Sequence, residues 1–243
     1  MKRILTALLL LSLFAAPAFA AKYDISLLST LSNNKFNDVV KQAGTVIAYR
    51  GIAPAEPQGI TGFDIGVETS FFKVDTATFD SVMSNNAPAY LGVPKVHVRK
   101  GLPFGIDLGA SYSMVPSSNI KVVGGEIQYA ILDGGVALPA LAVRGHYSTL
   151  LGVDDLDLRT YGADAVVSKG FLMFTPYAGA GVLRSDGSYA GTNVNLKTNL
   201  KDQSVTTPRV FGGVQIAIAL LRLTLDAEFA DVPVYTAKAS IGW

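Results

Sequence analysis

The chain has 243 residues, of which 49% are hydrophobic, 16% are charged and none is cysteine, and its formal net charge is +1. The length fits one domain or at most two, and the hydrophobic fraction excludes a disordered chain. Without cysteine, the chain forms no disulfide framework, thiol nucleophile or Cys-based metal site. The near-neutral charge offers no basic surface for nucleic acid.

Residues 1–20 have the three parts of a secretory signal peptide. Two basic residues follow the initiator methionine, residues 4–14 are mostly apolar, and Ala18-Phe19-Ala20 is a small-x-small cleavage site. This pattern predicts that the mature chain begins at Ala21. The apolar run is short for a membrane anchor, and no other stretch approaches the ~18 consecutive apolar residues of a transmembrane helix.

Residues 21–58 precede the first strand-like segment and contain one helical pattern. Phe36, Val39, Val40 and Ala43 recur at the spacing of one helix face, which predicts a short amphipathic helix. Two prolines then interrupt the chain before residue 59. The remaining residues, 59–243, have a different period and form the main domain.

From residue 60 onward, apolar side chains alternate with polar ones, which is the period of β-strands. In the first such segment Phe63 and Ile65 share one face, and Asp64 and Glu68 share the other. Most of the segments reach the ~9–11 residues that a tilted strand needs to cross a bilayer. The predicted strands are 60–72, 91–100, 104–114, 120–131, 136–149, 156–168, 171–184, 207–218, 222–230 and 234–243.

The connections between these segments alternate in length. Those after the second, fourth, sixth and eighth segments are short, whereas those after the first, third, fifth and seventh are longer and more polar. Short turns on one rim and long loops on the other are typical of outer-membrane barrels. The longest loops are 73–90, with a possible short helix at 77–83, and 185–206, where a further hairpin would raise the strand count to twelve.

These patterns predict an all-β fold: a closed, antiparallel, up-and-down transmembrane barrel of about ten strands, with a short N-terminal helix. Closure follows because an open sheet edge cannot be left in hydrocarbon. A soluble sandwich is the alternative, since it too has one apolar face. The export signal favours the membrane, as do aromatic residues near strand ends, where interfacial girdles lie; these are Phe104, Tyr112, Phe171, Tyr235 and Trp243.

Residues 21–58 have two possible places in such a barrel. They can pack on the periplasmic rim, or they can form a small plug in the lumen. We expect the rim, because a ten-stranded barrel is only slightly wider than the eight-stranded kind that side chains fill.

The last strand resembles the C-terminal signal by which outer-membrane proteins are recognised for assembly. Tyr235 and Ile241 belong to its apolar face, and Trp243 provides the terminal aromatic residue, where most such proteins have Phe. The resemblance implies that the barrel-assembly machinery and outer-membrane lipid are partners of this chain.

Several stretches resemble an uncharacterised family of small proteobacterial outer-membrane barrels. They cover most of residues 44–243 and imply a location in the outer membrane without implying a substrate. Residues 53–62 also show a faint similarity to the start of the first strand in long-chain fatty-acid transporters, from which no ligand-pocket residue can be transferred. The stretches that resemble the small-barrel family are 62–66, 100–105, 142–145, 168–171 and 175–179.

The inward faces of the predicted strands carry a nearly balanced set of charged and titratable residues. Opposite charges are expected to pair, because a lone charge in a narrow lumen is costly. The predicted lumen residues are Asp64, Glu68, Lys95, His97, Arg99, Asp107, Glu126, Arg144, His146, Asp164, Arg209, Asp226, Glu228 and Lys238.

Hairpin geometry suggests specific partners within this set. Asp226 is expected opposite Lys238, and Asp107 opposite His97, because facing residues of a hairpin lie close together. If the barrel closes, Lys238 also reaches the acids of the first strand.

Arg144 is expected to lie diagonal to Glu126 on one side and to Asp164 on the other. Diagonal neighbours on adjacent strands are within reach of long side chains. Arg144 therefore belongs to the predicted charge network on both sides of its strand.

The network supports two functions. A narrow pore or transporter for a small solute is the first, and a closed structural or surface-interaction barrel acting through loops 73–90 and 185–206 is the second. For the first, the residues expected to line the path are Lys95, Arg99, Glu126, Arg144, Asp164, Asp226 and Lys238.

An outer-membrane hydrolase is a third possibility, and we do not expect one. His146 and Ser148 share a face but lie on the same strand, which is a poor geometry for a base and a nucleophile. The two histidines lie on different strands and there is no cysteine, so no metal-ligand spacing is present. The sequence predicts neither a cofactor nor a metal.

Overall fold

The computed structural model describes residues 31–73, 78, 90–115, 118 and 120–243. The predicted signal peptide lies outside these residues, as does almost all of the predicted helix at 77–83. The elements, in chain order, are α2 (Asn33–Ile47), β1 (Phe63–Lys73), β2 (Tyr90–Gly101), the 3-10 turn η1 (Pro103–Gly105), β3 (Ile106–Met114), β4 (Lys121–Asp133), β5 (Ala140–Leu151), β6 (Leu156–Ser168), β7 (Phe174–Tyr189), α4 (Val194–Asn199), β8 (Gln203–Ile218), β9 (Leu221–Phe229) and β10 (Val234–Gly242).

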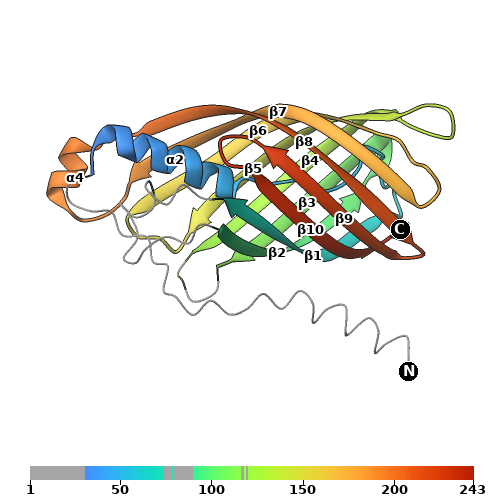
Figure 1. The fold of residues 1–243 in the computed structure, drawn as a ribbon, viewed down its shortest axis with the longest axis horizontal. Coiled ribbons are helices and arrows are strands. Elements are labelled where there is room, and N and C mark those ends of the chain that lie inside the picture. Colours follow the sequence, from blue (N-terminus) through green and yellow to red (C-terminus); the bar gives the residue numbers. More distant parts are fainter. Residues whose placement is uncertain (1–30, 74–77, 79–89, 116–117, 119) are drawn as a thin grey trace, which may run out of the picture.

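The strands form one closed antiparallel barrel, in which each strand pairs with its neighbours in sequence and β1 pairs with β10 (Figure 1). The predicted ten-stranded, up-and-down barrel with a short N-terminal helix is therefore confirmed. The twelve-strand alternative is wrong, because residues 194–199 form helix α4 and not a further hairpin.

Two predicted strand starts are wrong for the same reason. The strands predicted to begin at 104 and 171 begin at Ile106 and Phe174. Phe104 and Leu172 have positive φ angles, 66° and 55°, which extended backbone does not allow. Both residues lie in the short turns.

The two faces of the barrel wall differ sharply. The outer face is a continuous apolar surface, in which Ile65, Leu108, Ile127, Val182 and Leu225 are exposed. The inner face is polar in its middle and apolar towards the end that carries the long loops. Among the described residues, no helix is long and apolar enough to cross a membrane.

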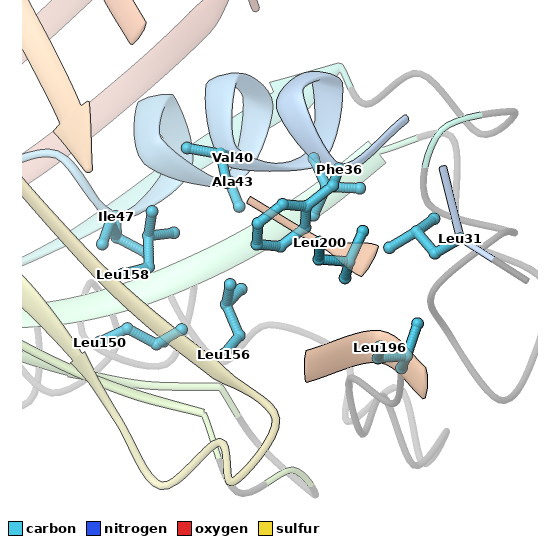
Figure 2. Packing of buried hydrophobic residues seen from close by; sticks show 11 residues of the cluster. Leu31, Phe36, Val40, Ala43, Ile47, Leu150, Leu156, Leu158, Leu196 and Leu200 are labelled. Atoms are coloured by element: carbon cyan, nitrogen blue, oxygen red, sulfur yellow. The ribbon is translucent and has the colours of Figure 1, made fainter. Parts of the chain in front are cut away.

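Helix α2 lies at the long-loop end, against the inner face of β5–β8 (Figure 1). Ser32 caps its N-terminus by accepting from Lys35 N, and its apolar stripe faces Leu150, Leu156 and Leu158 of the barrel wall (Figure 2). The stripe includes Phe36, which is fully buried. The apolar face of the helix is thus packed inside the barrel wall, whereas Asn34, Lys35 and Asp38 on its other face are exposed.

Residues 48–62 connect α2 to β1 and run through the lumen from one end to the other. The segment starts at the long-loop end, and Phe63 lies at the opposite end, where its N–H donates to Trp243 O at 3.2 Å. Residues 48–50 and 52–55 are buried. We call residues 48–58 the plug.

The placement of residues 21–58 on the periplasmic rim is therefore wrong for the described part of this segment, residues 31–58. A ten-stranded barrel has room for this extended segment because many inward side chains along its path are small. Gly51 illustrates this fit: a Cβ there would lie 2.9 Å from Arg144 Nη1, so only glycine passes this point without displacement.

Candidate functional site

The structure places all the predicted lumen residues on the inner face of the barrel. They form three clusters of charged groups, and each cluster is joined to the next across the barrel wall or through the plug. Every member is buried or nearly so.

The first cluster crosses the seam at which the first and last strands meet. Asp64 on β1 accepts from Lys238 Nζ on β10 at 3.1 Å and from Ser240 Oγ at 2.8 Å, and its Oδ1 lies 2.6 Å from His97 Nε2 on β2. Arg222 on β9 approaches the same carboxylate at 3.5 Å. One carboxylate therefore links four strands.

Glu68 extends this cluster along β1. It forms an ion pair with Lys95 at 2.5 Å, and its other oxygen lies 3.6 Å from His97 Nδ1. In the strand register Glu68 faces Lys238. The prediction that Lys238 reaches the acids of the first strand is confirmed.

The second cluster joins β2, β3 and β4 to the end of the plug. Arg99 Nη2 donates to Asp107 Oδ2 at 2.9 Å, and its Nε lies 3.7 Å from Glu126 Oε1. Asp107 also accepts from the main-chain N–H of Gln58 at 3.1 Å. Gln128 donates to the plug at Ala55 O, at 3.1 Å. These wall residues therefore bind both each other and the plug backbone.

Arg144 binds the plug backbone more extensively than it binds any carboxylate. Its guanidinium donates to the main-chain oxygens of Gly51, Ala53 and Pro54 at 2.5, 2.6 and 2.9 Å. Its Nε donates to Gln128 Oε1 at 2.6 Å. Buried carbonyl groups need hydrogen-bond donors, and this one side chain provides them for three residues of the plug.

The third cluster lies on β5, β6, β8 and β9. Arg209 donates to both oxygens of Asp164, with Nε to Oδ1 at 2.8 Å, and its Nη1 lies 3.3 Å from Glu228 Oε2. Its Nη2 lies 2.8 Å from His146 Nε2. On the other side, Glu228 accepts from Arg50 of the plug at 3.2 Å. The plug thus supplies a charged member of this cluster.

Tyr49 and Arg50 complete the plug at its narrow middle. Arg209 donates to Tyr49 O at 3.3 Å, and Arg50 donates to Ala48 O at 3.0 Å and stacks on the Phe72 ring at 5.0 Å. The Tyr49 side chain borders a small mid-lumen cavity together with Glu68 and Lys95.

Two predicted pairs are wrong, because the turns are longer than expected. Asp226 faces Thr236 and not Lys238, and it accepts instead from Tyr177 Oη at 2.7 Å. Asp107 faces Gly101 and not His97. The extra turn residues shift each register and so change which charges meet.

The predicted position of Arg144 is partly confirmed. It faces Gln128, which places it diagonal to Glu126 as expected, but it lies directly opposite Asp164 and not diagonal to it. Neither acid forms an ion pair with it in the described part of the chain, because the plug carbonyls occupy its donors.

Little open space is left beside the plug. A cavity in mid-lumen, bordered by Tyr49, Glu68 and Lys95, has a volume of about 10 Å3, which is room for about one water molecule. A cavity of about 280 Å3 lies towards the short-turn end, beside Pro54, Gln58 and Arg222. Between these cavities the described residues of the plug contact the wall through Gln128, Arg144 and Arg209, and they fill this part of the lumen.

The geometry does not assemble a catalytic set at His146. Ser148 Oγ donates to Ile47 O at 2.8 Å and lies 2.7 Å from Thr160 Oγ1, so its hydroxyl is engaged in holding α2. His146 Nε2 lies 2.8 Å from Arg209 Nη2 and 3.6 Å from Asp164 Oδ2, which is beyond hydrogen-bond distance, and both oxygens of Asp164 accept from Arg209. Within the described residues, no group of three or more His, Asp or Glu side chains is arranged to hold a metal.

Sequence reasoning missed the members of the site that belong to the plug, Tyr49 and Arg50, and the wall residue Gln128. The plug has no strand or helix period, so pattern analysis gave its side chains no direction. The available signal was the charge count of the inward set, which contains more acids than permanent cations. A buried arginine from elsewhere was needed to balance it.

No protein-family model matches this chain, and no curated protein matches it. Among solved structures, the chain is similar to Ail, the attachment invasion locus protein of Yersinia pestis (12% identity, 74% of this chain and 95% of that one, TM-score 0.31). It is also similar to the outer membrane protein Omp33 of Acinetobacter baumannii (7% identity, 76% of this chain and 100% of that one, TM-score 0.32). A third similar structure is the outer membrane protein OprG of Pseudomonas aeruginosa (11% identity, 78% of this chain and 97% of that one, TM-score 0.31). Likenesses this distant concern the barrel fold alone. The resemblances to the uncharacterised family and to fatty-acid transporters stay predictions.

Proposed function

We propose that this protein is an outer-membrane barrel, exported by a cleaved signal peptide and closed by its own plug, that acts by presenting a rigid head at the cell surface. The apolar outer wall supports contact with membrane lipid, since a closed barrel leaves no strand edge unpaired in hydrocarbon. The observation that carries the proposal is the filled lumen, which favours the closed alternative over solute passage.

The head consists of residues 31–40 and 186–204, and the second range includes α4. Strands β7 and β8 have 16 residues each, whereas β9 and β10 have 9. A tilted strand needs only ~9–11 residues to cross a bilayer. The additional residues therefore carry the β7–β8 hairpin beyond the membrane at the long-loop end.

The head is held together by specific contacts. Asn33 donates to Asn199 O at 2.8 Å and accepts from Lys201 N at 2.8 Å. Leu196 of α4 is buried in the same apolar cluster as Phe36 of α2 (Figure 2). A pre-ordered surface of this kind suits recognition of a partner, because little conformational freedom is lost on binding.

The C-terminal strand supports assembly by the barrel-assembly machinery. Tyr235, Ile241 and Trp243 all point outward and are exposed, as a signal read from outside requires. Trp243 also packs edge-on against Phe63, with ring centroids 4.2 Å apart, so it joins the two ends of the barrel sheet.

Passage of a small solute is the second candidate. Solute passage requires the plug to leave the lumen. The polar contacts of the plug favour such a movement, because water can replace its hydrogen bonds to Arg144 and Arg209, whereas water does not replace apolar packing. In that state the charged wall residues would line the path.

Trypsin treatment of whole cells tests the surface proposal. Lys197 and Lys201 are exposed in the head, so we expect cleavage after both in intact cells. The control is the double variant Lys197→Gln, Lys201→Gln, which should lose these two cuts only. Fragments ending at 197 or 201 that appear only after the cells are broken would place the head inside the cell and contradict the proposal.

A further inference from the structure

The four short turns carry large apolar side chains at their tips. Val136 and Leu172 are fully exposed, Phe104 is 89% exposed, and Leu138 and Leu220 are more than half exposed. Turn tips that stand in water are usually occupied by Gly, Pro, Asn, Asp or Ser. Exposed apolar groups gathered at one end of a molecule mark an interaction surface.

The backbone at three of these turns is unfavourable for the residues that occupy it. Phe104, Leu172 and Ala219 have φ angles of 66°, 55° and 54°, in the left-handed region that favours glycine. A bulky apolar side chain at such a position stabilises nothing inside the described protein, since Phe104 and Leu172 point into solvent-accessible space. Their presence is explained by a contact outside the chain.

The tips of the short turns carry little charge. Across residues 101–105, 134–139, 169–173 and 219–220, Lys169 is the one charged residue, and the exposed Lys100 and Asp133 lie at the strand ends just outside these ranges. Its ammonium donates to the main-chain oxygens of Gly135, Val136 and Leu138 at 2.7, 2.7 and 3.1 Å. A lysine that binds three carbonyl groups of a neighbouring turn needs less hydration than a free one, so it is compatible with an apolar environment.

The apolar tips adjoin the apolar wall, since Leu108, Leu132 and Phe174 are exposed on the adjoining strand ends. In the described part of the long-loop end, the exposed Val194 and Tyr90 are accompanied by Asp154, Asp155 and Asp231 in the turns. Continuity with the lipid-facing wall points to lipid as the occupant in preference to a protein partner.

We propose that the apolar side chains at the short-turn tips reach into the adjoining lipid leaflet and anchor this end of the barrel in the membrane. The inference rests on the proposed membrane location and adds a depth to it: the turn backbone lies at the level of the lipid headgroups, the apolar tips contact the acyl chains, and the head stands free. Phospholipid acyl chains are the chemical class that the turns contact.

Single-tryptophan variants test the proposal in the full mature chain. Trp243 is the only tryptophan, so Trp243→Phe provides a background without tryptophan. Into it we place Leu172→Trp or Val136→Trp at two turns, Ile127→Trp in the outer wall and Val194→Trp in the head. Each protein is reconstituted in phosphatidylcholine vesicles whose acyl chains carry bromine, and emission is compared with that in unbrominated vesicles and with aqueous iodide present.

We expect bromolipid to quench the turn tryptophans to an extent comparable with Ile127→Trp and several-fold more than Val194→Trp. Iodide should quench Val194→Trp alone. If the turn tryptophans respond to iodide and not to bromolipid while Ile127→Trp is quenched by lipid, the turns stand in water and the anchoring proposal fails although the membrane barrel stands. If Ile127→Trp is not quenched by lipid either, the proposed membrane location fails as well.

Discussion

Replacing Arg144 by leucine is expected to lower the free energy of unfolding by about 4 kcal/mol or more. The substitution removes the donors of four buried oxygens, three on the plug and one on Gln128, and each acceptor left unpaired costs about 1–3 kcal/mol. A urea titration of the protein in detergent micelles, followed by intrinsic fluorescence, measures the change.

Arg184→Leu is the matched control for this substitution. Arg184 lies on the same barrel but is half exposed, and it forms an ion pair with Asp186 at 3.4 Å. Exposed pairs contribute less than about 1 kcal/mol, so its titration midpoint should barely move. Equal midpoints for the two variants would show that Arg144 does not hold the plug.

Asp64→Leu is expected to destabilise the barrel by about 3–5 kcal/mol, the usual cost of removing one partner from a buried ionic cluster. Asp64 links β1 to β2, β9 and β10, and its loss leaves Lys238 buried beside His97 and Arg222 without the shared carboxylate. The loss falls on the seam that closes the barrel. The loss of stability is measured on a detergent gel, as the temperature at which the folded, fast-migrating band disappears.

Two further variants separate charge from packing at this site. Asp64→Asn removes the charge but keeps one acceptor oxygen, for Lys238 or Ser240, so it should lose less than the leucine variant. Asp157→Leu replaces an exposed acid, and surface substitutions usually stay within about 0.5 kcal/mol. A transition for Asp64→Leu as high as that of Asp157→Leu would mean that the seam does not depend on this carboxylate.

The barrel could be predicted from the sequence because its wall obeys one strict period. In β1, for example, the inward Asp64 and Gly66 are each followed by an outward apolar residue, Ile65 and Val67, and the same alternation dominates the other strands. Strand number and chain direction then follow from the turns. Periodicity gives side-chain direction but not register, which depends on turn length.

The charge partners were less predictable for that reason. A shift of the β2–β3 register moves Asp107 from His97 to Gly101 and gives Arg99 its carboxylate. The shift arises because Phe104 and the following glycine extend the turn in left-handed conformations, which residue type alone does not reveal at a phenylalanine.

The plug was the least predictable part, since its stability comes from partners distant in sequence. Residues 51–55 form no regular element, and four of their five carbonyl groups accept from Arg144 or Gln128 on two wall strands. The apolar inward residues at the long-loop end, such as Leu156 and Leu158, were a signal for something packed inside. A lumen that held only solvent would not place leucine there.

Single-channel recording in planar bilayers shows whether the plug closes the lumen. The full mature chain should insert without passing current, whereas a variant lacking residues 33–58 should conduct in discrete steps through the vacated, charged lumen. Steady ionic current through the full-length chain at low voltage would contradict a lumen that the plug closes.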